Sequence, residues 1–180
     1  MARRAAGVAL AVGVVSVSLA GCGSSSPGTA TPTTTDKQAA TAALWDPCTR
    51  IGSDTLEKLG LDQSSKESGA GGVPQPGWKI CTWFTPEHNQ STTVFSTIYT
   101  IDDFKKKEDN TDFVGISIAG RDGFRYHRAS DKNNESCALV FPGSSGSYQV
   151  SFENLDPGMT SSPCDGAVQV ANNVVPLFPH

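Results

Sequence analysis

Four cysteines spread along most of the chain are the strongest constraint on how it folds. Cys48, Cys81, Cys137 and Cys164 lie far apart, with no C-x-x-C pair and no histidine at the spacing of a zinc site. In an oxidising compartment such cysteines form disulfides, and four of them allow three pairings. The chain has five cysteines in all, so Cys22 is left over. The role of Cys22 therefore bears on where the protein is located.

The N-terminal residues have the organisation of an export signal. Arg3 and Arg4 precede an apolar segment, Ala5–Ala20. This length suits the hydrophobic region of a signal peptide and is shorter than the ~20 residues that span a bilayer. Residues 1–21 are therefore expected to be a cleaved signal peptide, with an uncleaved membrane anchor as the alternative.

The segment Leu19-Ala20-Gly21-Cys22 resembles the bacterial lipobox, in which the cysteine receives a diacylglyceryl group before cleavage. The resemblance implies that Cys22 is lipidated, which explains the odd number of cysteines. Two or more acyl chains bury enough methylene groups for stable anchoring. We therefore expect a protein held on the extracytoplasmic face of the cell membrane, with the membrane as its first partner.

Composition divides the remaining chain into a tether and one domain. Removal of residues 1–21 takes Arg3 and Arg4 from the 14 basic residues and leaves 18 acidic ones, a formal charge of −6. This charge argues against binding to nucleic acid. Residues 22–43 are rich in Ser, Thr and Pro and lack large apolar side chains, which predicts a disordered tether. Residues 44–180 are long enough for a single globular domain.

Hydrophobic periodicity predicts an α+β fold for residues 44–180. Asp54 and Glu57 are placed to start a short helix, and a helix capped by an Asp is expected over 102–110. Ser162 suits the cap of a closing helix, whose apolar side chains recur at helical spacing. The predicted apolar stripe of that helix comprises Cys164, Ala167, Val168, Ala171, Val174 and Val175.

Between the helices the apolar period changes to two. The expected strands are 79–84, 92–101, 113–120, 123–129, 137–142 and 147–153. Tyr148, Val150 and Phe152 alternate with Gln149 and Ser151, a pattern typical of a sheet with one solvated face. We therefore expect an antiparallel β-sheet meander with a short N-terminal helix and a C-terminal helix packed on the sheet.

The order of these elements favours one of the three disulfide pairings. A bond between Cys48 and Cys81 would join the opening helix to the first strand. A bond between Cys137 and Cys164 would join a central strand to the closing helix. The sequence alone leaves the other pairings, and four free thiols, open.

Several short motifs in this cysteine frame resemble one family. They are WDPC (45–48), CTW (81–83), Gly120 between two strands, CALVF (137–141) and CDGAVQVANNVVPLFP (164–179). Together they resemble an actinobacterial cell-envelope lipoprotein family of unknown function, to which the mycobacterial lipoproteins LprB and LprC belong. The resemblance implies an envelope location and supplies no catalytic residue. By looser analogy the domain looks like envelope domains of the Mog1/PsbP type, such as the external sensor domain of the kinase PknH, which hints at ligand sensing.

Residues 120–130 hold the candidate ligand site. Alternation along a strand places Arg125 and His127 on one face and Tyr126 on the other. Arg125 can hold a carboxylate or phosphate group with two parallel hydrogen bonds, and His127 adds positive charge below pH ~6.5. Tyr126 and Trp83 are expected to add an amphipathic wall. The alternative is an ordinary exposed strand face whose charges pair with neighbouring acids.

Catalytic patterns are weak in comparison. His88 and His180 are expected in a turn and at the chain end, GSSGS (143–147) departs from G-x-S-x-G, and EDNTD (108–112) lacks calcium-loop spacing. We expect no catalytic residue, no metal and no cofactor. The leading function is a lipid-anchored, non-catalytic binding or accessory module for a small anionic or envelope ligand or a membrane protein. The alternatives are a sensor-like domain acting with a membrane partner and an envelope hydrolase.

Overall fold

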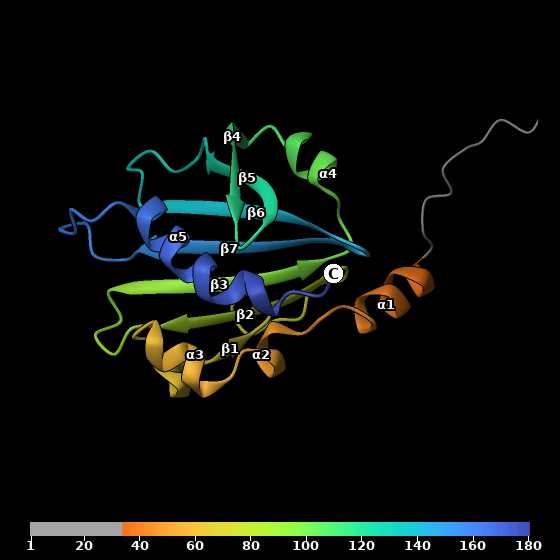
Figure 1. Cartoon of the computed structure of the whole chain (residues 1–180), viewed down its shortest axis with the longest axis horizontal. Helices are drawn as coiled ribbons and strands as arrows, with labels where there is room; N and C mark the ends of the chain where they lie inside the picture. The colour runs from red at the N-terminus through yellow and green to blue at the C-terminus, as the bar shows by residue number, and fades with distance from the viewer. Residues whose placement is uncertain (1–33) are drawn as a thin grey trace, which may run out of the picture. The chain divides into compact units, whose positions relative to one another are not determined.

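A seven-stranded antiparallel sheet organises the residues that the computed structural model describes, 34–180, with side chains from Asp36 onward (Figure 1). The predicted α+β class is confirmed. The strands are β1 (Glu67–Ser68), β2 (Trp78–Phe84), β3 (Gln90–Thr97), β4 (Asn110–Ile118), β5 (Arg121–Arg128), β6 (Ser136–Gly143) and β7 (Gly146–Asn154).

The strand order differs from a single meander. It is β1-β2-β3-β7-β6-β5-β4, so β3 pairs with the last strand and not with β4. In the register of this central pair, Val94 lies opposite Val150. Helix α4 (Ile101–Lys105) lies in the connection between β3 and β4, which are not neighbours in the sheet. Alternation predicted the strands but carries no information on which strands become neighbours.

Five α-helices and two 3₁₀ turns accompany the sheet within residues 34–180. The helices are α1 (Thr34–Ala42), α2 (Pro47–Arg50), α3 (Ser53–Lys58), α4 and α5 (Pro163–Val174), and the turns are η1 (Gln63–Ser65) and η2 (Val175–Leu177).

Of the three predicted helix caps, one is confirmed. The Ser162 hydroxyl accepts the amide of Asp165 and begins α5. Helix α3 begins after Gly52 without a side-chain cap, so Asp54 lies inside it. Helix α4 is capped by Thr100, whose hydroxyl accepts from the Asp103 amide. The Asp103 carboxylate accepts from the amide and hydroxyl of Thr100, and these bonds lower the pKa of Asp103.

One face of the sheet packs against α5, which crosses it in Figure 1. The buried residues of α5 are Ala167, Val170, Ala171 and Val174. Val168, predicted to belong to this apolar stripe, is 36% exposed, and Val170 is buried in its place. Because two positions along a helix correspond to a rotation of about 200°, Val168 and Val170 point to nearly opposite sides and cannot both face the sheet.

The opposite face is also covered, so the prediction of a solvated face is wrong for its central part. Phe104 of α4 packs there with Tyr126 and Val140, in a second hydrophobic cluster separate from the one beneath α5. Gln149, expected on the wet side, is only 3% exposed. The alternation of Gln149 with apolar neighbours gave the correct strand but the wrong degree of burial.

The segment expected to be a disordered tether contains helix α1. Thr41 near its end accepts a hydrogen bond from the Gly77 amide at 2.7 Å and donates to the Lys37 carbonyl at 2.6 Å. The bond from Gly77 gives α1 a tertiary partner that composition does not reveal. The predicted signal peptide, the lipidated Cys22 and the rest of the tether lie outside the described residues. Within residues 34–180, no helix has both the length and the hydropathy needed to cross a membrane.

Candidate ligand-binding cleft

Two disulfides hold helices to the sheet. Cys48 is bonded to Cys81 and Cys137 to Cys164, with Cα–Cα distances of 5.1 Å and 4.9 Å. This is the pairing that the order of elements favoured. Each bond joins a half-buried cysteine on a helix to a strand cysteine that is at most 1% exposed.

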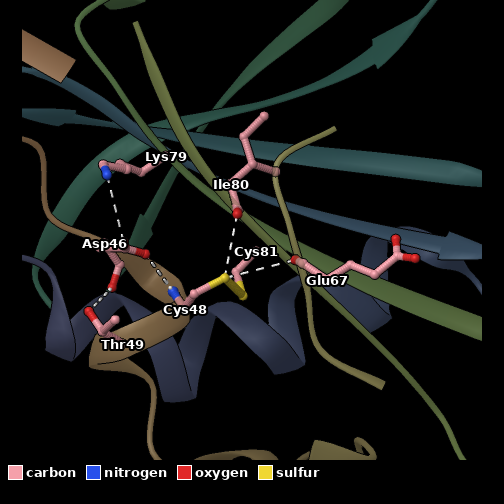
Figure 2. Close-up of polar contacts among 7 residues, drawn as sticks. All are labelled: Asp46, Cys48, Thr49, Glu67, Lys79, Ile80 and Cys81. Carbon is pink, nitrogen blue, oxygen red and sulfur yellow. Dashed lines mark hydrogen bonds and ion pairs between the residues drawn. A yellow bond between two sulfur atoms is a disulfide. The ribbon is translucent and has the colours of Figure 1, made fainter. Parts of the chain in front are cut away.

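The first disulfide is closed in by backbone and by an ion pair (Figure 2). The Asp46 carboxylate accepts from the Cys48 amide at 3.0 Å, and its other oxygen lies 3.8 Å from Lys79 Nζ. The Cys48 sulfur lies 3.5 Å from the Ile80 carbonyl oxygen and 3.8 Å from that of Glu67. Since an oxidised sulfur carries no proton, these are packing contacts and not hydrogen bonds.

The second disulfide borders a cleft of about 820 Å³. The residues that line the cleft lie where β5 and β7 finish and α5 begins. This end of the sheet is on the left in Figure 1. The loops 129–135 and 155–162 form its walls. We call this the Arg125 cleft, and the residues that matter to its chemistry are Arg125, His127, Glu135, Asp156, Ser162 and Cys164.

Strand β5 delivers Arg125 and His127 to the cleft from one face, as alternation predicted. Arg125 is half-buried, and its Nε atom is buried without a hydrogen-bond partner. Among residues 34–180 no carboxylate forms an ion pair with it. A guanidinium held in this way has hydrogen-bonding capacity for a ligand.

His127 contacts the disulfide. Its Nε2 atom lies 3.6 Å from the Cys164 sulfur, while Nδ1 is buried without a partner. One potential ligand atom of His127 and the sulfurs of Cys137 and Cys164 lie within 4.8 Å of one another. Since the disulfide bonds both sulfurs, they are not available as thiolate ligands for a metal ion in this oxidised form.

Hydrogen bonds shape the cleft walls. The Asn154 amide donates to the Ser161 carbonyl at 2.9 Å, which ties β7 to the following loop. The Asp131 carboxylate accepts from the amides of Glu135 and Ser136 at 3.0 and 2.8 Å. Partial burial raises the pKa of Asp131, but these bonds and one from the Ser136 hydroxyl outweigh it and hold the pKa below its usual value.

Tyr126 and Trp83 do not line the cleft, which corrects the prediction of an aromatic wall. Both are 1% exposed. Tyr126 points to the opposite face and stacks on Phe113, where burial raises its pKa above the usual value. Trp83 belongs to the cluster beneath α5. Both side chains contribute to core packing, and the role as an amphipathic wall that was predicted for them is absent from this cleft.

Residues that the sequence did not single out for this site come from the two wall loops and from the start of α5. Glu135 and Asp156 place two carboxylates at the cleft, and Ser162 and Cys164 bring the N-terminal turn of the helix. The Ser-Pro-Cys order at 162–164 did indicate a helix start. It gave no sign that this start would lie beside β5, because that depends on the strand order.

The other two histidines, His88 and His180, lie away from this site. His88 is exposed and stacks on Phe84, with ring centroids 5.3 Å apart. His180 is exposed at the end of the chain. Of the three histidines, His127 alone is among the residues lining the Arg125 cleft.

Fold and site together define a small α+β domain with two disulfides and a polar cleft that carries an arginine, a histidine and a helix start. The chain belongs to the family described as "Protein of unknown function (DUF3558)", whose model matches residues 17–177. The expectation of an uncharacterised family is thus confirmed at this level. No curated protein and no solved structure matches the chain significantly.

Proposed function

We propose that this protein is a lipid-anchored, non-catalytic binding module of a bacterial cell envelope, and that the Arg125 cleft binds a small ligand through a carboxylate or phosphate group. The observation that carries the proposal is that Arg125 and His127 line a cleft while each keeps one nitrogen atom without a hydrogen-bond partner. Arg125 Nε and His127 Nδ1 are both buried, and neither has a hydrogen-bond partner. Burying such groups without partners costs free energy, which a ligand would recover.

Arginine suits this role because its planar fork pairs with two oxygens of one anionic group. The N-terminal turn of α5 adds the partial positive charge of a helix start at the same cleft. Glu135 and Asp156 lie on the loop walls. They favour a ligand whose anionic end meets Arg125 and whose donor groups meet the carboxylates.

The contacts of His127 favour binding over catalysis. Within the described residues, the one side-chain atom within hydrogen-bonding distance of the His127 ring is the sulfur of Cys164, which is part of a disulfide. A hydrolase would need His127 beside a serine hydroxyl or a carboxylate in the cleft. We therefore place the envelope hydrolase behind both the binding module and a sensor-like domain that acts with a membrane partner.

The location rests on the sequence and on the family. The lipobox-like segment that ends at Cys22 and the actinobacterial resemblance support an anchor on the extracytoplasmic face. Two disulfides fit an oxidising compartment. A Cys22→Ala variant expressed with its full N-terminus should lose incorporation of labelled fatty acid and leave the membrane fraction. Normal labelling of that variant would contradict the anchor.

Ligand binding can be tested on the oxidised protein by NMR titration. Inorganic phosphate and acetate serve as probes, and the Nε–H signal of Arg125 is the readout because that group has no partner in the free protein. We expect saturable shifts at Arg125 and His127. Arg125→Lys should keep the charge and weaken binding about tenfold, since the loss of a charge-assisted bidentate contact is of this order.

Arg128→Gln provides the matched control. Arg128 lies on the same strand, is exposed and points to the opposite face. Arg128→Gln and Arg125→Gln each remove one positive charge, but only the second changes the cleft. Phosphate affinity should stay within about twofold for Arg128→Gln and fall at least about tenfold for Arg125→Gln. Equal weakening by these two variants would mean that only net charge matters, and the cleft would not be the site.

A further inference from the structure

The surroundings of the Cys137–Cys164 disulfide distinguish it from a purely structural crosslink. Cys164 is half-buried and lines the Arg125 cleft, whereas Cys137 is 1% exposed. An incoming thiolate in the cleft therefore has access to Cys164. Thiol–disulfide exchange depends on which sulfur can be approached and on how well the leaving thiolate is stabilised.

Groups that can stabilise a thiolate lie near the two sulfurs. Cys164 is the second residue of the 12-residue helix α5, after Pro163. His127 Nε2 lies 3.6 Å from its sulfur and, within 4.8 Å, also reaches that of Cys137. Helix N-termini and histidine neighbours are the environments that lower the pKa of cysteine thiols and make them reactive. Arg125 adds a further cation at the same cleft.

We propose that Cys137–Cys164 is a redox-active disulfide, opened by a dithiol reductant that enters the Arg125 cleft, with His127 as the group that stabilises the departing thiolate. This inference does not depend on the binding of an anionic ligand. It concerns the sulfur chemistry of the cleft, which the proposed binding function leaves unused.

The exchange balances as follows. One thiolate of the reductant attacks the Cys164 sulfur, a new S–S bond forms, the Cys137–Cys164 bond breaks, and the electron pair leaves on Cys137. His127 Nε2 lies within reach of that sulfur and donates a hydrogen bond to it, and the sulfur then takes a proton from solvent. The second thiolate of the reductant then attacks the mixed disulfide, and Cys164 leaves as a thiolate at the α5 N-terminus. The reductant ends as a disulfide, and the protein ends as two thiols once the Cys164 thiolate has also taken a proton from solvent.

The Cys48–Cys81 disulfide supplies an internal reference. No histidine contacts its sulfurs among the described residues, and the atoms nearest Cys48 include the carbonyl oxygens of Ile80 and Glu67. Carbonyl oxygens carry partial negative charge and oppose the formation of a thiolate. Both disulfides can be followed in one sample, so the concentration of reductant cancels from the ratio of their rates.

The test uses the oxidised mature chain in dithiothreitol buffers with a chelator, because the reduced cysteines and His127 could bind a stray metal ion. After an acid quench and alkylation, mass spectrometry measures the opening of each disulfide. Cys137–Cys164 should open at least tenfold faster than Cys48–Cys81. At equilibrium it should be reduced at a tenfold lower ratio of reduced to oxidised reagent, which corresponds to a reduction potential about 30 mV higher for this two-electron couple.

His127→Gln separates activation from simple exposure. It should reduce the ratio of the two rates about tenfold, whereas His180→Gln, at the exposed chain end, should leave the ratio unchanged. Equal rates for the two disulfides in the wild-type protein would overturn the proposal. So would a ratio that His127→Gln leaves unchanged, since exposure alone would then explain the faster opening.

Discussion

The two disulfides begin from the same local design. In each, a capping residue and a proline precede the helical cysteine, Asp46-Pro47-Cys48 in α2 and Ser162-Pro163-Cys164 in α5. In each, the partner is a buried cysteine on a strand. A proline suits the first helical position because its fixed φ is helical and the amide it lacks would have no helical partner. The cysteine that follows is thereby held at the start of a helix.

The neighbours of the two helix starts are different. Helix α2 is four residues long and lies against β1 and β2, where backbone carbonyls face Cys48. Helix α5 is three times as long, begins at the Arg125 cleft and meets His127. The Cys48–Cys81 disulfide is therefore surrounded by backbone, whereas the Cys137–Cys164 disulfide lies beside His127 at the cleft that Arg125 lines. The comparison shows that strand order, more than the cysteine motif, determines which residues surround a disulfide.

The largest effect we expect is the loss of stability when either disulfide is removed. The linked cysteines are 33 residues apart for Cys48–Cys81 and 27 for Cys137–Cys164. The chain-entropy estimate gives ~3–4 kcal/mol for loops of this length. Cys48→Ala with Cys81→Ala, and Cys137→Ala with Cys164→Ala, should therefore lower the free energy of unfolding by similar amounts, measured by urea titration.

Similar losses would sharpen the comparison, because they would show that the two disulfides are alike as crosslinks and that any difference between them lies in their reactivity. If removal of the Cys137–Cys164 disulfide lowered the free energy of unfolding by less than ~1 kcal/mol, the two disulfides would not be alike as crosslinks. The Arg125 cleft would then be formed largely without its disulfide.

A second and smaller effect concerns the close contact that holds α5 on the sheet. A Cβ atom added to Gly166 would lie 2.6 Å from the ring of Phe152 on β7. Gly166→Ala must push the helix start away or distort the ring, at a cost of ~1–3 kcal/mol. We expect a lower urea midpoint for this variant.

Gly115→Ala on β4 is the matched control, because no atom lies within 4 Å of a Cβ added there. Its free energy of unfolding should stay within ~0.5 kcal/mol of the wild type. If Gly166→Ala behaves like this control, α5 is held less tightly at its start than the structure indicates.

Sequence reasoning succeeded where the signal is local. Alternation placed Arg125 and His127 on one face of a strand, and the Ser162-Pro163 pair marked the start of α5. Both inferences depend on the geometry of one element. The pairing of the cysteines was favoured only by the order of the elements, and the structure has that pairing.

What the sequence missed depends on contacts between distant segments. The pairing of β3 with β7 places α5 over the sheet and brings Cys164 to His127. No local pattern encodes that neighbourhood. Tyr126 and Trp83 were assigned to the ligand site because aromatic side chains suit both binding and core packing, and burial is a property of the whole fold.

The smallest effect we expect comes from the carboxylates that brace the two regions. Asp46 caps α2 beside Cys48, and Asp131 holds the loop that carries Glu135 at the cleft. The pKa of Asp131 lies below its usual value because of its hydrogen bonds. A carboxyl whose pKa is lowered by folding stabilises the protein above its unfolded pKa of ~3.9, and this contribution is lost as the pH falls through the folded value.

Asp131→Asn should therefore lower the free energy of unfolding by ~1 kcal/mol or less at pH 7, since solvent screens this partly exposed group. The variant should also lose less stability than the wild type when urea titrations are repeated between pH 5 and about pH 2.5. Asp122→Asn, at an exposed carboxylate for which no hydrogen bond or ion pair occurs within residues 34–180, is the control and should follow the wild-type pH dependence. If Asp131→Asn follows it as well, the wall of the Arg125 cleft does not depend on this carboxylate.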